Sequence, residues 1–268
     1  MQVFNDKTAP YQLPFEAYGI QMRFCTNEPE LLDEIQPLMP PGWRRRPRSE
    51  AQHRLGLLAE DHDVYSIYHD TICVHDAPGR KMALMMMDTQ LEGYVALHSP
   101  DFIFVHAGVV AVGNHAIVMP GLSFSGKTTL VTALVEAGAV YYSDEFAVLD
   151  ESGRVHPYPR RLTVRSPGGP TVDRYVEELG GIPGAQPLPV GLVVATQYVP
   201  QAEWDPSELS VGAGALAVFE HAVPARDRPE QTLRAIKTAL NGAVIQQGER
   251  GEADELAGVL LETLRAAA

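Results

Sequence analysis

The sequence predicts an α/β fold with a mixed β-sheet, fused to a β-rich N-terminal layer, and three observations lead to it. Short apolar runs alternate with segments of helical periodicity from about residue 100 onward. A tight turn at Gly113-Asn114 joins two strands, 102–112 and 115–120, into a hairpin. The second strand runs directly into a glycine-rich loop, which is followed by a helical pattern.

The N-terminal part shows strand alternation and two helical patterns. Strands are expected at 18–24, 64–68 and 71–74, and helices at 27–38 and 81–97. Asn27 is the expected cap of the first helix, and Met85 to Met87 are expected to fill the core. We therefore expect residues 1–98 to form a β-rich subdomain, and residues 99–268 a second domain with C-terminal helices.

The polar loop at 41–52 carries an arginine run from Arg44 to Arg48. Such a run is typical of a solvated loop, and it is also compatible with docking of an acidic partner. The sequence leaves both interpretations open.

The second part continues as strands and helices. Strands are expected at 139–142, 146–149, 161–165 and 190–199, and helices after residue 126, near 175–179, from Leu233 to Val244 and from Leu256 to Leu264. The glycine-rich loop is expected at the edge of the resulting sheet.

The loop matches the P-loop (Walker A) pattern G-x-x-x-x-G-K-[ST] in full. The nucleotide-binding residues that it predicts are Gly121, Leu122, Ser123, Phe124, Ser125, Gly126, Lys127, Thr128 and Thr129. Its glycines let backbone N–H groups point at phosphate oxygens, and Lys127 reaches the β- and γ-phosphates. The Thr128 hydroxyl is a ligand for Mg²⁺. ATP and Mg²⁺ are therefore the expected cofactors.

An acidic pair, Asp144-Glu145, follows the next predicted strand. One helix and one strand separate the pair from the loop. That strand is expected to bring both carboxylates to the ligand-binding edge of the sheet. One carboxylate can take the proton of an attacking hydroxyl, which we expect of Asp144, and Glu145 can hold Mg²⁺ together with Thr128. A solvated turn is the alternative.

Three other side chains are candidates for the reaction site. His106 interrupts an apolar strand, and the hairpin brings it back beside the loop, although strand histidines are more often hydrogen-bonded core or edge residues. Phosphoryl transfer often uses a cationic side chain from outside the loop, for which Arg161 and Arg165 are candidates. Arginines that solubilise a strand edge are an equal alternative.

Composition restricts the class of protein. The net charge of −13 argues against a general nucleic-acid binder, and no apolar stretch is long enough to span a membrane. Cys25 and Cys73 lie far apart, without metal-ligand spacing, and the N-terminus has no signal-peptide pattern. A cytoplasmic protein is expected, and a homo-oligomer is compatible with the sequence.

The order of His106-Ala107-Gly108, hairpin, P-loop and acidic pair resembles the catalytic domain of the HPr kinase/phosphorylase family over residues 100–165. The resemblance implies a fold related to phosphoenolpyruvate carboxykinase and phosphorylation of a serine on a small carrier protein. It also implies that Asp144 is the catalytic aspartate and that His106 with Gly108 is the family's His-Gly.

The chain departs from that family in two places. Glu145 stands where the family has a second aspartate, and the signature E-I-R-G-x-G-I after the acidic pair is missing. We therefore carry over neither the phosphorylase reaction nor the hexamer. The chain is more similar to divergent HPr-kinase-like proteins, some of which phosphorylate a serine of a small precursor peptide.

The expected activity is ATP-dependent phosphoryl transfer to a hydroxyl, with a serine of a small protein or peptide as acceptor. Lys127, Asp144, His106 and Arg165 are the expected catalytic residues. Three alternatives stay open: a small-molecule kinase at the same site, a nucleotide-sensing protein without catalysis and, as the weakest, plain ATP hydrolysis.

Overall fold

The computed structural model describes residues 4–47, 51, 53–121, 125–165 and 171–267. It divides into two compact units, Met1–Asp101 and Phe102–Ala268. Three of the expected nucleotide-binding residues, Leu122, Ser123 and Phe124, lie outside the described residues, as does Arg48.

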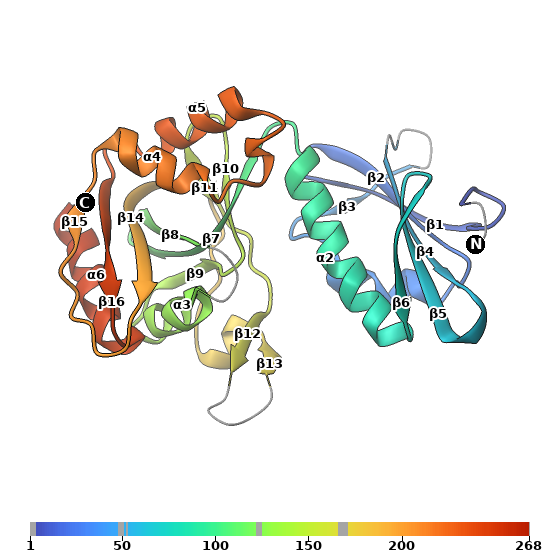
Figure 1. Cartoon of the computed structure of the whole chain (residues 1–268), viewed down its shortest axis with the longest axis horizontal. Coiled ribbons are helices and arrows are strands. Elements are labelled where there is room, and N and C mark those ends of the chain that lie inside the picture. The colour runs from blue at the N-terminus through green and yellow to red at the C-terminus, as the bar shows by residue number, and fades with distance from the viewer. Residues whose placement is uncertain (1–3, 48–50, 52, 122–124, 166–170, 268) are drawn as a thin grey trace. The chain divides into compact units, whose positions relative to one another are not determined.

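A six-stranded sheet in the order β3-β1-β2-β4-β5-β6 forms the first unit (Figure 1). Its strands are β1 (Tyr11–Ala17), β2 (Ile20–Thr26), β3 (Arg44–Arg45), β4 (His53–Ala59), β5 (Val64–His69) and β6 (Ile72–Pro78). Tyr18 and Gly19 form the β1–β2 turn at φ 48° and 79°, so the strand expected from residue 18 begins at Ile20.

One long helix packs on this sheet. α2 (Arg80–His98) contacts β4, β5 and β6 and buries Met87, Leu91 and Val95. Met85 is 58% exposed, so only part of the methionine run fills the core. Short helical segments complete the unit: α1 (Leu31–Glu34), η1 (Gln36–Leu38) and η2 (Asp61–Asp63).

The expected helix cap at Asn27 was wrong. Its side-chain amide donates to the Ala59 carbonyl and accepts from the Ala59 N–H, each at 2.8 Å. The residue therefore ties the end of β2 to the end of β4, because a strand end offers both backbone groups at once.

The second unit has an eight-stranded mixed sheet in the order β11-β10-β7-β8-β14-β16-β15, with β9 paired to β7. These strands are β7 (Ile103–Val112), β8 (His115–Pro120), β9 (Val140–Ser143), β10 (Phe146–Leu149), β11 (Arg154–His156), β14 (Leu188–Tyr198), β15 (Ser207–Glu208) and β16 (Val244–Arg250). A separate small hairpin joins β12 (Leu162–Arg165) to β13 (Thr171–Arg174).

Helices cover both faces of this sheet (Figure 1). They are α3 (Lys127–Glu136), α4 (Val211–Phe219), α5 (Pro229–Ala239) and α6 (Ala253–Ala267), with η3 (Val176–Leu179) and η4 (Val223–Ala225) between them. Because neighbouring strand residues point to opposite faces, Val109 packs under α4 and α5, whereas Val110 packs under α3 and α6. The unit is a sheet between two helical layers.

Strand direction gathers three loops at one edge of the sheet. β14 runs parallel to both β8 and β16, so the carboxyl ends of all three lie together. β8 lies between β7 and β14, and the segment that begins at Gly121 follows its carboxyl end, so the glycine-rich loop starts at the edge of the sheet where it was expected. Val244 begins β16, and the helix expected to reach it ends at Ala239.

Candidate functional site

Gly121 and Gly126, the two glycines of the P-loop pattern, are fixed by a backbone contact to β7 and by the start of α3. The Gly121 N–H donates to the His106 carbonyl at 3.1 Å. Gly126 precedes α3 in the left-handed conformation, with φ 84°, which only glycine adopts without strain. The N-terminal amides of α3 are therefore presented at the carboxyl end of β8, a geometry that suits an anion.

A glycine on β7 lets α3 approach the sheet closely. A Cβ atom at Gly108 would lie 2.6 Å from Val131 Cγ2 and 3.7 Å from Lys127 Cβ. Gly108 thus has a packing role, because it sets the distance between β7 and the helix that carries Lys127 and Thr128.

The acidic pair lies beside this segment because two strands share one neighbour. β9 pairs with the second half of β7, where Ser143 is opposite Val109, and β10 pairs with the first half. The break between them is Asp144-Glu145, and the Ala107 N–H donates to the Glu145 carbonyl at 3.1 Å. The pair therefore lies level with the end of β8.

Asp144 connects the start of α3 to β9. Its Oδ2 accepts from Thr128 Oγ1 at 3.2 Å, and its Oδ1 accepts from the Tyr141 hydroxyl at 3.0 Å. Burial raises the pKa of Asp144 to about 6, and the nearby Glu145 charge adds to this, against the opposing effect of the two hydroxyl donors. A carboxyl with this pKa can accept and release a proton near neutral pH.

Glu145 faces His106. His106 Nδ1 lies 3.4 Å from Glu145 Oε1, and their side chains are 35% and 40% exposed. The Ser143 hydroxyl accepts from the backbone N–H groups of Glu145 and Phe146 and fixes this turn. The two acids therefore have different partners: Asp144 contacts the Thr128 hydroxyl, whereas Glu145 forms a partly exposed pair with His106.

Lys127 lies close to both carboxylates. Burial lowers the pKa of Lys127, whereas Glu145 and Asp144 raise it. Burial disfavours the charged form of Lys127, and an anion bound at the loop would favour that form again.

His221 belongs to the same neighbourhood, although no sequence pattern indicated it. Its carbonyl accepts from the His106 N–H at 2.9 Å, and its Nδ1 is buried without a partner among the described residues. The pKa of His221 is lowered, first by burial and then by Lys127 and His106. It is placed by the bridge between Val105 and Ala222, which joins segments far apart in the chain.

The two candidate arginines have different surroundings. The Arg161 guanidinium donates to the Tyr175 hydroxyl at 2.9 Å and lies 4.9 Å from the centre of that ring. Arg165 ends β12, and its side chain is outside the described part of the chain.

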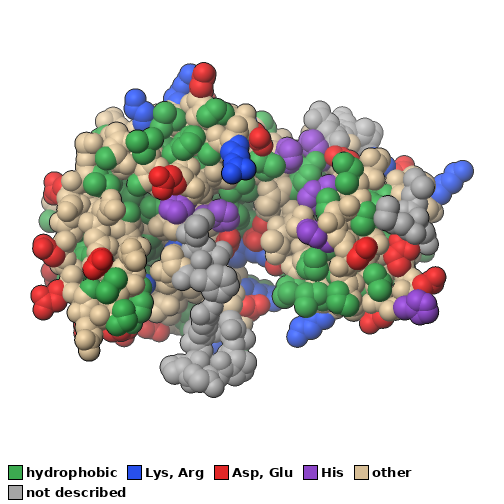
Figure 2. Space-filling model, in the orientation of Figure 1, with side chains coloured by type: hydrophobic (Ala, Val, Ile, Leu, Met, Phe, Trp, Pro, Cys, Tyr) green, Lys and Arg blue, Asp and Glu red, His purple; other side chains and the backbone are tan. Residues whose placement is uncertain are grey.

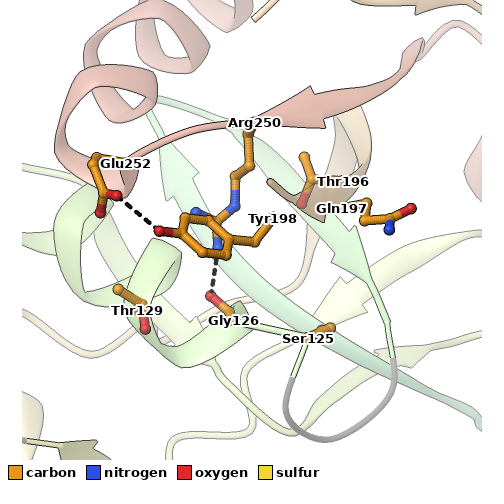
Figure 3. Close-up of a pocket in the computed structure, with 8 residues that line it drawn as sticks. All are labelled: Ser125, Gly126, Thr129, Thr196, Gln197, Tyr198, Arg250 and Glu252. Atoms are coloured by element: carbon orange, nitrogen blue, oxygen red, sulfur yellow. Dashed lines mark hydrogen bonds between the residues drawn. The ribbon is translucent and has the colours of Figure 1, made fainter. Parts of the chain in front are cut away.

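A cavity of about 440 Å³ lies beside the start of α3 (Figure 3). Its walls come from the loop and the start of α3, from the end of β14, and from the end of β16 with the segment that follows it. They are formed by Ser125, Gly126, Thr129, Thr196, Gln197, Tyr198, Arg250 and Glu252.

Two features are absent from the described residues: a metal-binding cluster and a helix that could cross a membrane. No group of three or more His, Cys, Asp and Glu side chains there could hold a metal ion. Within the same residues, no helix is both long and apolar enough to cross a membrane. Acidic side chains are scattered over both units on the face drawn in Figure 2, in line with the net charge of −13.

The fold and site define a mixed-sheet α/β protein with an anion-binding geometry at the start of a helix. No family model and no curated protein matches the chain. A solved structure described as the Hpr(Ser) kinase/phosphatase from Coxiella burnetii is similar to it, with 13% identity and a TM-score of 0.35. That likeness covers 61% of this chain and 94% of the other, and it bears on no residue's role.

Proposed function

We propose that the protein transfers the γ-phosphoryl group of ATP to a hydroxyl, with a serine of a small protein or peptide as acceptor. The carrying observation is Asp144, a largely buried carboxyl with a pKa raised to about 6, hydrogen-bonded to the threonine that ends the P-loop pattern. A general base works best when its pKa lies near the operating pH. The complete P-loop pattern supplies the phosphate-binding half of the proposal.

Each residue has a defined task in this reaction. Lys127 and the amides at the start of α3 bind the phosphate oxygens. The Asp144 carboxylate takes the acceptor hydroxyl proton as the new O–P bond forms. The bond from the γ-phosphorus to the β–γ bridging oxygen breaks, and ADP leaves with its electron pair. His106 and Glu145 form the exposed rim next to Asp144, where the acceptor approaches.

The residues present fit Mg²⁺. The Thr128 hydroxyl and the Glu145 carboxylate would hold the ion, because both offer the oxygen ligands that Mg²⁺ prefers. Thr128 Oγ1 lies 3.2 Å from Asp144 Oδ2, and the Glu145 charge acts on the same carboxyl, so the ion would lie beside Asp144, which remains the base. The ion would neutralise the developing charge on the β- and γ-phosphates.

The approach to Asp144 is open to solvent, which supports a peptide acceptor over a small molecule held in an enclosed pocket. The side chains that flank Asp144 are 35% and 40% exposed. A serine on a flexible segment can reach such a rim without a lid.

The test separates binding from chemistry. Asp144→Asn should keep Mg-ATP binding in calorimetry and lower ³²P transfer from γ-labelled ATP by about 10²- to 10⁴-fold, the usual range for a general base. Lys127→Ala should lose both. Asp150→Asn changes a carboxyl on the β10–β11 turn and should leave both intact.

Three outcomes would redirect the proposal. Equal transfer by Asp144→Asn would remove the aspartate from its role. Label in the low-mass fraction of a lysate, and none on protein, would favour the small-molecule kinase. Tight ATP binding by the wild type without any transfer would favour a nucleotide sensor.

A further inference from the structure

The cavity beside the start of α3 lies where three parallel strands end. β8 leads into the loop, β14 ends at Tyr198, and β16 ends at Arg250. Ligands of open α/β sheets bind outside the carboxyl ends of such strands. The volume of about 440 Å³ is also within the range of small-molecule sites, roughly 300–1,000 Å³.

Arg250 is a buried cation at the base of this cavity. Only 3% of the residue is exposed, and its guanidinium donates to the carbonyls of Gly126 at 3.1 Å and of Gly251 at 3.0 Å. Its Nε has no hydrogen-bond partner among the described residues. Burial lowers the pKa of Arg250, and the nearby Glu252 charge raises it. A buried guanidinium is costly unless it is compensated, and here the two carbonyls and the Glu252 charge compensate it, so Arg250 ties the end of β16 to the Gly126 backbone at the start of α3.

Tyr198 provides a flat surface next to that cation. The Arg250 guanidinium lies 5.3 Å from the ring centre, and the Tyr198 hydroxyl donates to Glu252 Oε1 at 2.9 Å (Figure 3). The residue is nevertheless 44% exposed, so part of the ring is open to a ligand. Aromatic rings of this kind stack with nucleobases regardless of base identity.

The threonines at the start of α3 give the bound molecule a direction. Thr128 contacts Asp144, whereas Thr129 lines the cavity. A phosphate chain at the helix start would therefore have its reacting end toward Asp144 and its other end toward Tyr198.

We propose that this cavity binds the nucleoside part of the nucleotide. The base stacks on Tyr198, and Glu252, which can only accept hydrogen bonds when ionised, accepts from the ribose hydroxyls. Arg250 is a positioning residue, because it holds the Gly126 carbonyl and thereby the loop. The inference rests on the proposed function, and it specifies a ribonucleotide with little discrimination between bases.

Calorimetry with two ligands tests the inference. ATP carries the nucleoside, and inorganic tripolyphosphate carries only the phosphates. Tyr198→Ala should weaken ATP binding about tenfold or more, as lost stacking does, and leave tripolyphosphate binding unchanged. Tyr198→Phe keeps the ring and should retain most of the affinity. Tyr11→Ala removes a tyrosine of similar exposure, 40%, in the other unit and should change nothing.

A second comparison tests the ribose contact. The wild type should bind ATP more tightly than 2′,3′-dideoxy-ATP, and Glu252→Gln should reduce that preference. If ATP and tripolyphosphate bind the wild type equally and Tyr198→Ala changes neither affinity, the inference is overturned and the proposed function stands. If the wild type binds neither ligand, the proposed function fails as well.

Discussion

Asp144→Asn should stabilise the ligand-free protein while it slows the phosphoryl transfer. The native carboxyl has a pKa raised from 3.8 to about 6, so the folded state holds the proton more tightly than the unfolded chain does. The stability from this group is therefore present below pH 3.8 and is lost as the pH rises toward 6. An amide stays neutral at every pH and avoids that loss.

The size of the effect follows from the shift. About two pKa units at 1.36 kcal/mol each correspond to up to about 3 kcal/mol near pH 8. The free energy of unfolding of the variant should exceed that of the wild type by this order near pH 8. The difference should fall toward zero near pH 4. Saturating Mg-ATP should reduce the advantage, because the ionised carboxylate then has a cationic partner.

Denaturant unfolding followed by tryptophan fluorescence can measure this in the second unit alone. The chain has two tryptophans, Trp43 in the first unit and Trp204 in the second. A Trp43→Phe background therefore leaves a single reporter, which packs against the core of the second unit.

Asp150→Asn is the matched control because its expected change in the free energy of unfolding has the opposite sign. Burial alone would raise the pKa of Asp150, but hydrogen bonds from Ser152 and His156 hold it below the usual value. Its stability is present above the unfolded pKa and is lost as the pH falls, so this variant should be less stable near pH 8. Equal loss of stability in both variants would refute the assignment of Asp144 as a destabilised carboxyl.

Two substitutions and one titration probe the loop and its supports. Gly108→Ala should destabilise the second unit by about 1–3 kcal/mol in denaturant unfolding, because the new Cβ would lie 2.6 Å from Val131. Gly126→Ala should weaken ATP binding in calorimetry, because a left-handed φ of 84° costs a non-glycine residue about 1–2 kcal/mol and the Cβ would lie 2.5 Å from Arg250. The His221 imidazole should titrate below its usual 6.5 by NMR, since burial lowers its pKa; a value above 6.5 would contradict its buried position.

Local sequence signals predicted several elements of both units. The turn at Gly113-Asn114 and the apolar runs around it gave the hairpin of β7 and β8, and the helix after residue 126 is α3. The helix expected at 81–97 is α2, Arg80–His98. These elements could be predicted because turn residues and periodicity act over a few neighbouring positions.

The long-range parts of the site could not be predicted from the sequence. Arg250 and Tyr198 lie beside Gly126 only because β14 runs between β8 and β16, and strand order leaves no local pattern. β16 itself was missed because Val244 continues the apolar spacing of the preceding helix. His221 was missed for a similar reason, since its bridge to β7 joins distant segments.

The most direct test of the account is a phosphoproteomic comparison. A host lysate would receive Mg-ATP with either the wild type or Asp144→Asn. The account predicts one or a few serine sites phosphorylated only by the wild type, and these sites would identify the acceptor. The same sites phosphorylated by both proteins, or none by a wild type that binds Mg-ATP, would contradict it.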